Sequence, residues 1–321
     1  MRLRIWFSLV CVALAALLLW WGVQPTTNTQ AEVQSDTVAL LLDTDIGTGA
    51  LQMKLGAKLA AKERRLDLIT AAPDYAGGTV LSQAALMEQL LEKNVKAILL
   101  VPVSGEDLTL PLAMAAQRKV PVLSLGDGAD PGNIACVISG DSEQAGEMAA
   151  LALRERLPED AHILLITGAA EDTAAALCLK GARRALEAEG APSVLRTVAL
   201  DGQTPDDLLT LLSLYPHAEG ILCLTGEATE IAAKAMSRTT REIVLVGMDC
   251  GQNRTTYLEN RQVDAMVLGM PFAMGYLGVQ FASQAIAGKE IPARYGTESR
   301  VIDLDNMYLP ENQKLVFPML Q

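Results

Sequence analysis

Acidic side chains recur where predicted strands end, and there they are well placed to bind a small molecule. Asp43 and Asp45 follow the apolar run Val38–Leu42, while Asp127 and Asp249 each come just after a later apolar run. In open α/β sheets, ligands bind beyond the carboxyl ends of the strands. Carboxylates accept hydrogen bonds from hydroxyl groups and attract cations. The pattern therefore predicts a site for a polyol or for a cationic ligand.

Three further side chains complete the predicted ligand-binding set. Tyr75 lies in a loop, and Thr225 and Glu227 follow the apolar run Gly220–Leu224. The acidic members of the set have no obvious counter-cation in the sequence. A structural interpretation stays open for every one of them, because acids after strands also cap helices, accept turn amides or favour the first helical turn.

The sequence contains no recognisable catalytic or metal-binding constellation. No Ser, Cys or Thr lies in a nucleophile-elbow motif, and Gly47-Thr48-Gly49 lacks the spacing of a nucleotide-binding turn. The chain has two histidines and five cysteines, without a CxxC pair. We therefore expect no enzyme activity, no cofactor and no metal.

Composition limits the class of partner. The chain has 321 residues, half of them hydrophobic, which is enough for one large core or two medium ones. Its 26 basic residues against 38 acidic ones give a net charge of −12. Nucleic-acid binding needs a basic surface to neutralise phosphates, so this balance argues against it.

The first residues differ from the rest of the chain. Arg2 and Arg4 precede the apolar run Ile5–Val23, which is long enough to span a bilayer. The segment 1–24 is either a retained membrane anchor or a signal peptide cleaved near Thr29-Gln30-Ala31, and both interpretations stay open. The polar segment 25–36 is a predicted linker. In either case the body of the protein is expected to work outside the cytoplasm.

From Val38 onward, short apolar runs alternate with helical patterns, which is typical of a doubly wound parallel sheet. The alternation restarts after a helix that Asp141 caps, with Gln144 three residues later. The two halves of this alternating pattern resemble each other. In the first half a predicted strand ends just before Asp127, and in the second half a predicted strand ends just before Asp249. The expected strands are 38–42, 66–71, 97–103, 121–125, 135–139, 162–166, 193–200, 220–224, 243–246, 263–268 and 301–304. One expected helix follows the first strand and ends near Arg65. The other expected helices span 80–93, 108–118, 174–189, 205–214, 228–237, 254–260 and 271–287.

Several segments, in order and spacing, resemble the type I periplasmic binding proteins, a superfamily that includes ribose- and galactose-binding proteins and the effector domains of lactose-repressor-like regulators. They are VALLLDTD, NVKAILLVPVS, KVPVLSLGD, VISGDSEQAGEMAALAL, KGARRALEAEG and VLVGMDCG. The resemblance implies two Rossmann-like α/β domains joined by a three-strand hinge. It divides the chain into an N-terminal lobe, 37–140 plus 270–300, and a C-terminal lobe, 141–269 plus 301–321.

The predicted pocket departs from the family's sugar sites. The segment Thr44–Thr48 has no aromatic residue for stacking on a pyranose, Gly126-Asp127 replaces an Asp-Arg pair, and Thr225-Gly226 replaces Asn-Asp. Asp249 matches the family's ligand-binding aspartate. If Asp127 and Asp249 oppose each other across the cleft, Asp249→Ala should weaken ligand binding and leave thermal unfolding of the unliganded protein nearly unchanged.

The resemblance implies an extracytoplasmic solute-binding protein that clamps a small polar ligand and delivers it to an ABC permease. The ligand would be sugar-like, a polyol or cationic. The alternative is a membrane-anchored sensor that reports ligand occupancy to a receptor such as a histidine kinase.

Overall fold

A computed structural model describes residues 35–73, 81–127, 131–168, 173–188, 191–200 and 202–317. Residues Asp36–Gln321 form one compact unit, separate from Met1–Ser35. This unit contains both sheets and every hydrophobic core cluster described below, so a fragment that begins at Ser35 keeps the complete fold. The predicted anchor or signal segment and Tyr75 lie outside the described residues. Within those residues, no helix combines the length and the hydropathy needed to cross a bilayer.

The chain builds two six-stranded sheets with the same order of strands. The first runs β2-β1-β3-β4-β5-β11 with every pair parallel, and the second runs β7-β6-β8-β9-β10-β12 with only β12 antiparallel. The first sheet comprises β1 (Thr37–Leu41), β2 (Asp67–Ala71), β3 (Ala97–Leu100), β4 (Val122–Leu125), β5 (Cys136–Ser139) and β11 (Arg294–Gly296). The second comprises β6 (His162–Thr167), β7 (Ser193–Ala199), β8 (Gly220–Cys223), β9 (Val244–Met248), β10 (Ala265–Leu268) and β12 (Arg300–Asp303). The α/β prediction is confirmed.

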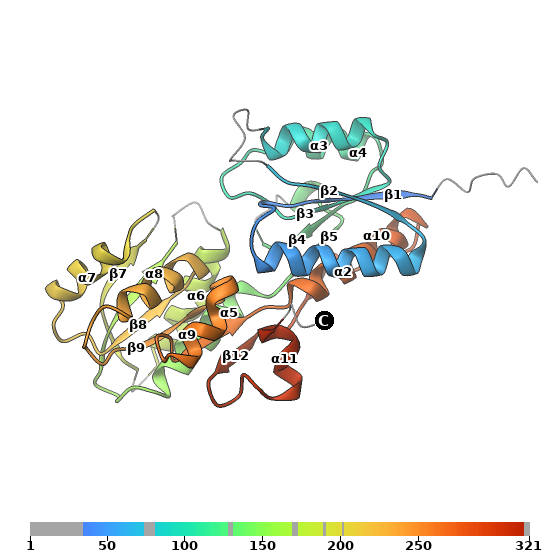
Figure 1. Cartoon of the computed structure of the whole chain (residues 1–321). Coiled ribbons are helices and arrows are strands. Elements are labelled where there is room, and N and C mark those ends of the chain that lie inside the picture. The colour runs from blue at the N-terminus through green and yellow to red at the C-terminus, as the bar shows by residue number, and fades with distance from the viewer. Residues whose placement is uncertain are drawn as a thin grey trace, which may run out of the picture. The chain divides into compact units, whose positions relative to one another are not determined.

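Helices cover both faces of each sheet. On the first sheet, α3 and α4 pack on one face and α2 and α10 on the other (Figure 1). The helices of this sheet are α2 (Thr48–Arg64), α3 (Gln83–Glu92), α4 (Thr109–Gln117) and α10 (Pro271–Ile286). Those of the second are α5 (Ser142–Arg154), α6 (Thr173–Leu186), α7 (Pro205–Leu214), α8 (Gly226–Met236) and α9 (Arg254–Glu259).

The continuous apolar strands are explained by this double covering. Leu40 and Leu99 face the core under α2 and α10, while Leu41 and Ile98 face the core under α3 and α4. All four are fully buried. Successive side chains of a strand point to opposite faces, so a strand covered on both faces has no polar side.

Pairs of glycines bring helices into close contact on both sheets. A Cβ on Gly56 of α2 would lie 2.0 Å from the Phe272 carbonyl oxygen of α10, and a Cβ on Gly275 would lie 2.1 Å from that of Met53. On the second sheet, a Cβ on Gly146 of α5 would lie 2.0 Å from the carbonyl oxygen of Cys178 in α6. These helices pack backbone to backbone, which a larger residue would prevent.

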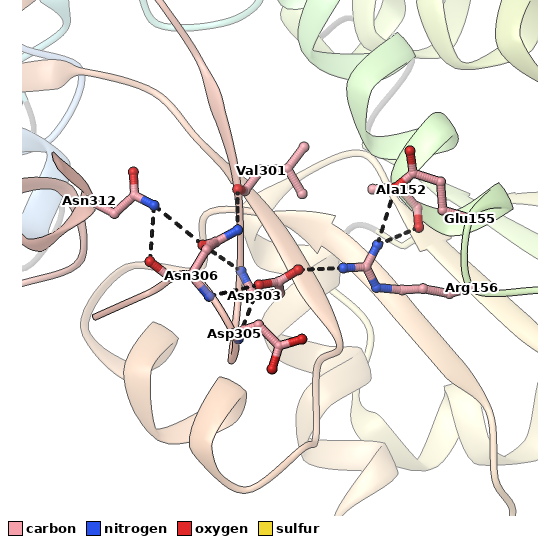
Figure 2. Close-up of polar contacts among 8 residues, drawn as sticks. All are labelled: Ala152, Glu155, Arg156, Val301, Asp303, Asp305, Asn306 and Asn312. Atoms are coloured by element: carbon pink, nitrogen blue, oxygen red, sulfur yellow. Dashed lines mark hydrogen bonds and ion pairs between the residues drawn. The ribbon is translucent and has the colours of Figure 1, made fainter. Parts of the chain in front are cut away.

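The C-terminal segment folds onto the second sheet. After β12, a turn leads to α11 (Pro310–Val316). Asp303 accepts a hydrogen bond from Arg156 Nη2 at 2.6 Å and bonds from the backbone of Asp305 and Asn306, while Asn312 donates to the Asn306 carbonyl (Figure 2). Neither α11 nor β11 was expected from the sequence. The residue limits of the two lobes remain a prediction.

Candidate functional site

A pocket of about 570 Å³ lies where the strands of the first sheet end. Its walls come from the residues after β1, β3, β4 and β5, and Ser142 of α5, Ala174 of α6 and Met274 of α10 complete it. In the strand order 2-1-3-4-5, the order in which strands are added to the sheet reverses between β1 and β3, and ligands bind at such a switch point. The topology therefore places this pocket at the position where an α/β sheet is open to a ligand.

Gln83, the first residue of α3, fixes the two strand ends that border the switch point. Its side chain is fully buried and donates to the Leu42 carbonyl at 3.0 Å and to the Val101 carbonyl at 2.7 Å. Its side-chain oxygen accepts from the Val103 amide at 2.9 Å. The loops that carry Asp43 and Ser104 are thus held by one buried amide, which sequence reasoning missed.

Asp127 lines the pocket just beyond β4. Its side chain is only 4 % exposed and accepts hydrogen bonds from Arg294 Nη1 at 2.9 Å and from the Ser142 hydroxyl at 3.0 Å. Burial alone would raise the pKa of this carboxyl, but the bonds and charge of Arg294, with the hydroxyls of Ser142 and Ser139, lower it overall. Asp127 is therefore held in its ionised form, in which its oxygens can only accept hydrogen bonds.

Asp43 lines the same pocket from the end of β1, in a different electrostatic setting. One carboxylate oxygen accepts from the Thr44 amide at 2.8 Å. Burial raises the pKa of Asp43, and the backbone hydrogen bond opposes the rise only partly. The pocket thus combines a stabilised carboxylate with one whose charge is disfavoured.

Asp45 and Asp249 do not line this pocket. Asp45 is 69 % exposed and forms an ion pair with Lys54 at 2.7 Å. Asp249 follows β9, accepts from the Gly251 amide at 2.9 Å and pairs with Arg254 Nη2 at 3.1 Å. Burial raises the pKa of Asp249 despite the opposing charge of Arg254.

Arg254 is the centre of a second polar cluster. It is only 3 % exposed and donates to the Gly251 carbonyl at 2.8 Å, the Leu315 carbonyl at 3.0 Å and the Thr48 hydroxyl at 2.7 Å. Thr48 is the first residue of α2, so this bond joins a helix of the first sheet to the second. The carboxylate of Asp249 balances the charge of the buried Arg254 side chain. Asp249 therefore has a structural role, whether or not it also contacts a ligand.

Thr225 and Glu227 lie at the start of α8. The Thr225 hydroxyl caps the helix by accepting from the Ala228 amide at 3.2 Å, and Glu227 is exposed in the first turn. Of the predicted set, the structure thus brings Asp43 and Asp127 together in one pocket, and Thr225, Glu227, Asp45 and Asp249 are not among its lining residues. Ligand contact by any of these residues stays a prediction.

The expectation that the acidic set lacks counter-cations is wrong. Lys54, Arg254 and Arg294 each pair with one predicted acid. Arg254 comes five residues after Asp249, a spacing that could have signalled the pair. Arg294 is 167 residues from Asp127, and only the placement of β11 beside β5 brings the two together.

Comparison with known proteins agrees with this architecture. The sequence model of the periplasmic binding protein domain matches residues 38–290. The ribose import binding protein of Haemophilus influenzae is 25 % identical over 293 residues, covering 90 % of this chain and 97 % of the relative. The D-allose-binding periplasmic protein of Escherichia coli is 24 % identical, covering 79 % and 86 %.

Solved structures share the fold. A carbohydrate transporter solute-binding protein from Agrobacterium radiobacter, in complex with D-arabinose, superposes with a TM-score of 0.78 at 18 % identity, covering 88 % of this chain and 99 % of that one. A solute-binding protein of Actinobacillus succinogenes with bound D-allose gives 0.76 at 18 % identity, covering 84 % and 98 %. These relatives are binding proteins and not enzymes. The two sheets have the type I arrangement, and the chain belongs to the periplasmic binding protein domain family.

Proposed function

We propose that this protein is an extracytoplasmic solute-binding protein that takes up a small, neutral, polyhydroxylated ligand and delivers it to an ABC permease. The observation that carries the proposal is the pocket at the switch point of the first sheet, which is lined by an ionised Asp127 and by Asp43. Hydroxyl groups of a ligand donate well to such carboxylates.

The charge pairing favours a neutral ligand over a cation. Arg294 already compensates the charge of Asp127, and burial disfavours the charge of Asp43. A cationic ligand would have to compete with Arg294 for the same carboxylate. A polyol or sugar needs only free lone pairs, and a carboxylate has about four, more than Arg294 and Ser142 occupy.

The lining also bears on the kind of hydroxylated ligand. The described residues that line the pocket include Ser104, Ser139, Ser142 and Met274 but no aromatic side chain. A pyranose presents an apolar face that suits a stacked ring, whereas an acyclic polyol or a small sugar exposes hydroxyls on all sides. Relatives of this chain are named as binding proteins for ribose, D-allose and xylitol, and all three compounds are polyhydroxylated and neutral.

Family membership implies an extracytoplasmic location and a permease as the partner. The apolar run Ile5–Val23 would then be either an export signal or an anchor that keeps the protein at the membrane. A second candidate function is a membrane-anchored sensor that reports ligand occupancy to a receptor such as a histidine kinase. The length of that run, and the lack of an aromatic side chain among the described residues that line the pocket, favour this alternative.

A thermal-shift screen of the fragment from Ser35 onward tests the ligand class. The panel contains pentoses, hexoses, acyclic polyols, amino acids and polyamines. A ligand that binds only the native state raises the melting temperature, by several degrees at a hundredfold excess over its Kd. We expect sugars or polyols to raise it. A response to polyamines alone would contradict the neutral ligand, and no response at all would contradict solute binding.

A further inference from the structure

Basic side chains gather at the amino edge of the first sheet, where its parallel strands begin. The segments from the last turn of each helix to the next strand carry eight basic residues and three acidic ones. Three of the basic residues, Lys62, Arg64 and Arg65, end α2. The other five, Lys93, Lys96, Arg118, Lys119 and Lys289, follow α3, α4 and α10. All but Arg64 are exposed. Even with Asp36 and Asp67 at the strand starts, the edge keeps an excess of positive charge in a chain of net charge −12.

The second sheet provides an internal comparison. The same segments there, in the described residues, carry eight basic and eight acidic side chains. The helix dipole favours cations at the C-terminus of every helix, so it acts equally on both sheets. The excess on the first sheet therefore needs another explanation.

The cations of the two edges also differ in their partners. On the second sheet, Arg156 pairs with Asp303 (Figure 2), Arg184 with Glu147 and Arg238 with Asp206. On the first sheet, no ion pair between described residues engages any of the eight cations, although Arg118 donates to the Leu91 carbonyl. The positive field of this edge is thus directed to solvent.

The polar linker joins the fold at this same edge. The Asp67 amide donates to the Asp36 carbonyl at 3.0 Å, and the Lys96 amide donates to the Thr37 carbonyl at 2.8 Å. The linker between the apolar run and the fold therefore ends among Arg65, Lys96 and their neighbours. Even fully extended, residues 24–36 span at most about 45 Å. If the apolar run stays in the bilayer, this length of chain limits how far the edge can move from the membrane surface to about 45 Å.

We propose that the amino edge of the first sheet docks on a membrane surface that contains anionic lipids. The proposal rests on the anchored form of the proposed function. Each basic residue near an anionic surface contributes to binding, and the attraction acts within a Debye length. The carboxyl ends of the strands lie at the opposite edge of the sheet, so the pocket with Asp43 and Asp127 stays accessible in the docked state.

Vesicle cosedimentation of the fragment from Ser35 onward tests the docking, because the fragment lacks the apolar run. The vesicles are phosphatidylcholine alone or phosphatidylcholine mixed with phosphatidylglycerol, at about 0.1 M salt, where a Debye length of about 10 Å screens the distant acidic surface. We expect binding to the mixed vesicles only. The triple variant Lys93→Gln, Lys96→Gln, Lys119→Gln should bind about tenfold more weakly or worse.

The matched control is Lys180→Gln, Arg183→Gln, Arg196→Gln, which removes the same charge from exposed positions of the second sheet's helices and strands. It should bind like the unmodified fragment. Absence of binding to mixed vesicles, equal binding to neutral vesicles, or equal losses in both variants would overturn the docking. The ligand-induced rise in melting temperature, measured on the same samples, reports solute binding separately, so failure of one proposal is distinguishable from failure of the other.

Discussion

Two aspartates that face one pocket are expected to respond to pH in opposite ways. The pKa of Asp43 is raised by burial, so the native state binds its proton more tightly than the unfolded chain does. The ionised Asp43 therefore costs stability, and this cost appears as pH rises above the ordinary value of 3.8. The pKa of Asp127 is lowered by Arg294 and the neighbouring hydroxyls in spite of burial, so its ionisation stabilises the fold above that value.

The corresponding asparagine variants give the first prediction. In the absence of ligand at pH 7, Asp43→Asn should raise the melting temperature by about 1–3 °C and Asp127→Asn should lower it by a similar amount. The difference for Asp43→Asn should vanish as pH falls below the ordinary value of 3.8, whereas the difference for Asp127→Asn should persist below that value and vanish only as pH falls through the lowered pKa of Asp127. Thermal denaturation across pH measures this, and shifts of the same sign would contradict the assignment.

The second prediction concerns Asp249. Its loss would leave the Arg254 cation, which is 3 % exposed, without its counter-charge. We expect Asp249→Ala to reduce the free energy of unfolding by about 2–3 kcal/mol, because unpaired buried charges are costly. This differs from the sequence-based expectation that the unliganded protein would be unaffected.

The control for Asp249→Ala is Asp45→Ala, which breaks an exposed ion pair and should change stability by less than about 0.5 kcal/mol. Urea denaturation of both variants decides the matter. If Asp249→Ala proved as stable as Asp45→Ala, the structural role assigned to the pair with Arg254 would be wrong.

At the residue scale, the sequence identified acids but not their partners. Asp43 and Asp127 were predictable because an acid after a buried strand lies at the carboxyl edge of a parallel sheet. Arg294 was not, because it comes from a strand of three exposed residues far along the chain. Buried Gln83 was also missed, since a polar residue at the start of a helix is ordinarily expected to face solvent.

At the element scale, glycine contacts between helices give a third prediction. Gly56→Ala would place a methyl group 2.0 Å from the Phe272 carbonyl oxygen, so α2 and α10 would have to separate. We expect a loss of about 1–3 kcal/mol in the free energy of unfolding. Gly49→Ala in the same helix meets no atom within 4 Å and should leave stability unchanged or slightly increased.

Denaturant unfolding of the two alanine variants measures the difference. Equal stabilities would mean that the close approach of α2 and α10 is not needed for the fold. The same reasoning applies to Gly146 and Gly181 on the second sheet, where the approach is equally close.

Most elements were predictable because apolar runs and helical periodicity agree with a strand buried on both faces. The predicted helix Pro205–Leu214 has the limits found in the structure, and most other elements differ by a few residues at their ends. β11 was missed because Arg294-Tyr295-Gly296 is short and exposed and has no apolar run. α11 was missed because its seven residues provide too few positions to show a helical period.

At the scale of the whole molecule, the repeated strand order explains why the two halves of the sequence echo each other. β4 and β9 occupy equivalent places in their sheets, so Asp127 and Asp249 follow equivalent strands. Their surroundings nevertheless differ, because Asp127 lines the pocket and Asp249 pairs with Arg254. The alternation of strands and helices predicted the doubly wound sheets, but the chemistry of each position depends on side chains from other parts of the chain.

The central claim is that a polyhydroxylated ligand binds at the pocket of Asp43 and Asp127. Isothermal titration calorimetry with the sugar or polyol that gives the largest thermal shift tests it most directly. The comparison uses the unmodified fragment, Asp127→Asn, Ser104→Ala and the control Asp206→Asn, whose carboxylate is 70 % exposed and pairs with Arg238. We predict a Kd at least about tenfold weaker for Asp127→Asn, since a charge-assisted hydrogen bond is lost, a smaller weakening for Ser104→Ala, and no change for Asp206→Asn. Unchanged affinity in both Asp127→Asn and Ser104→Ala would contradict the account and place the ligand elsewhere.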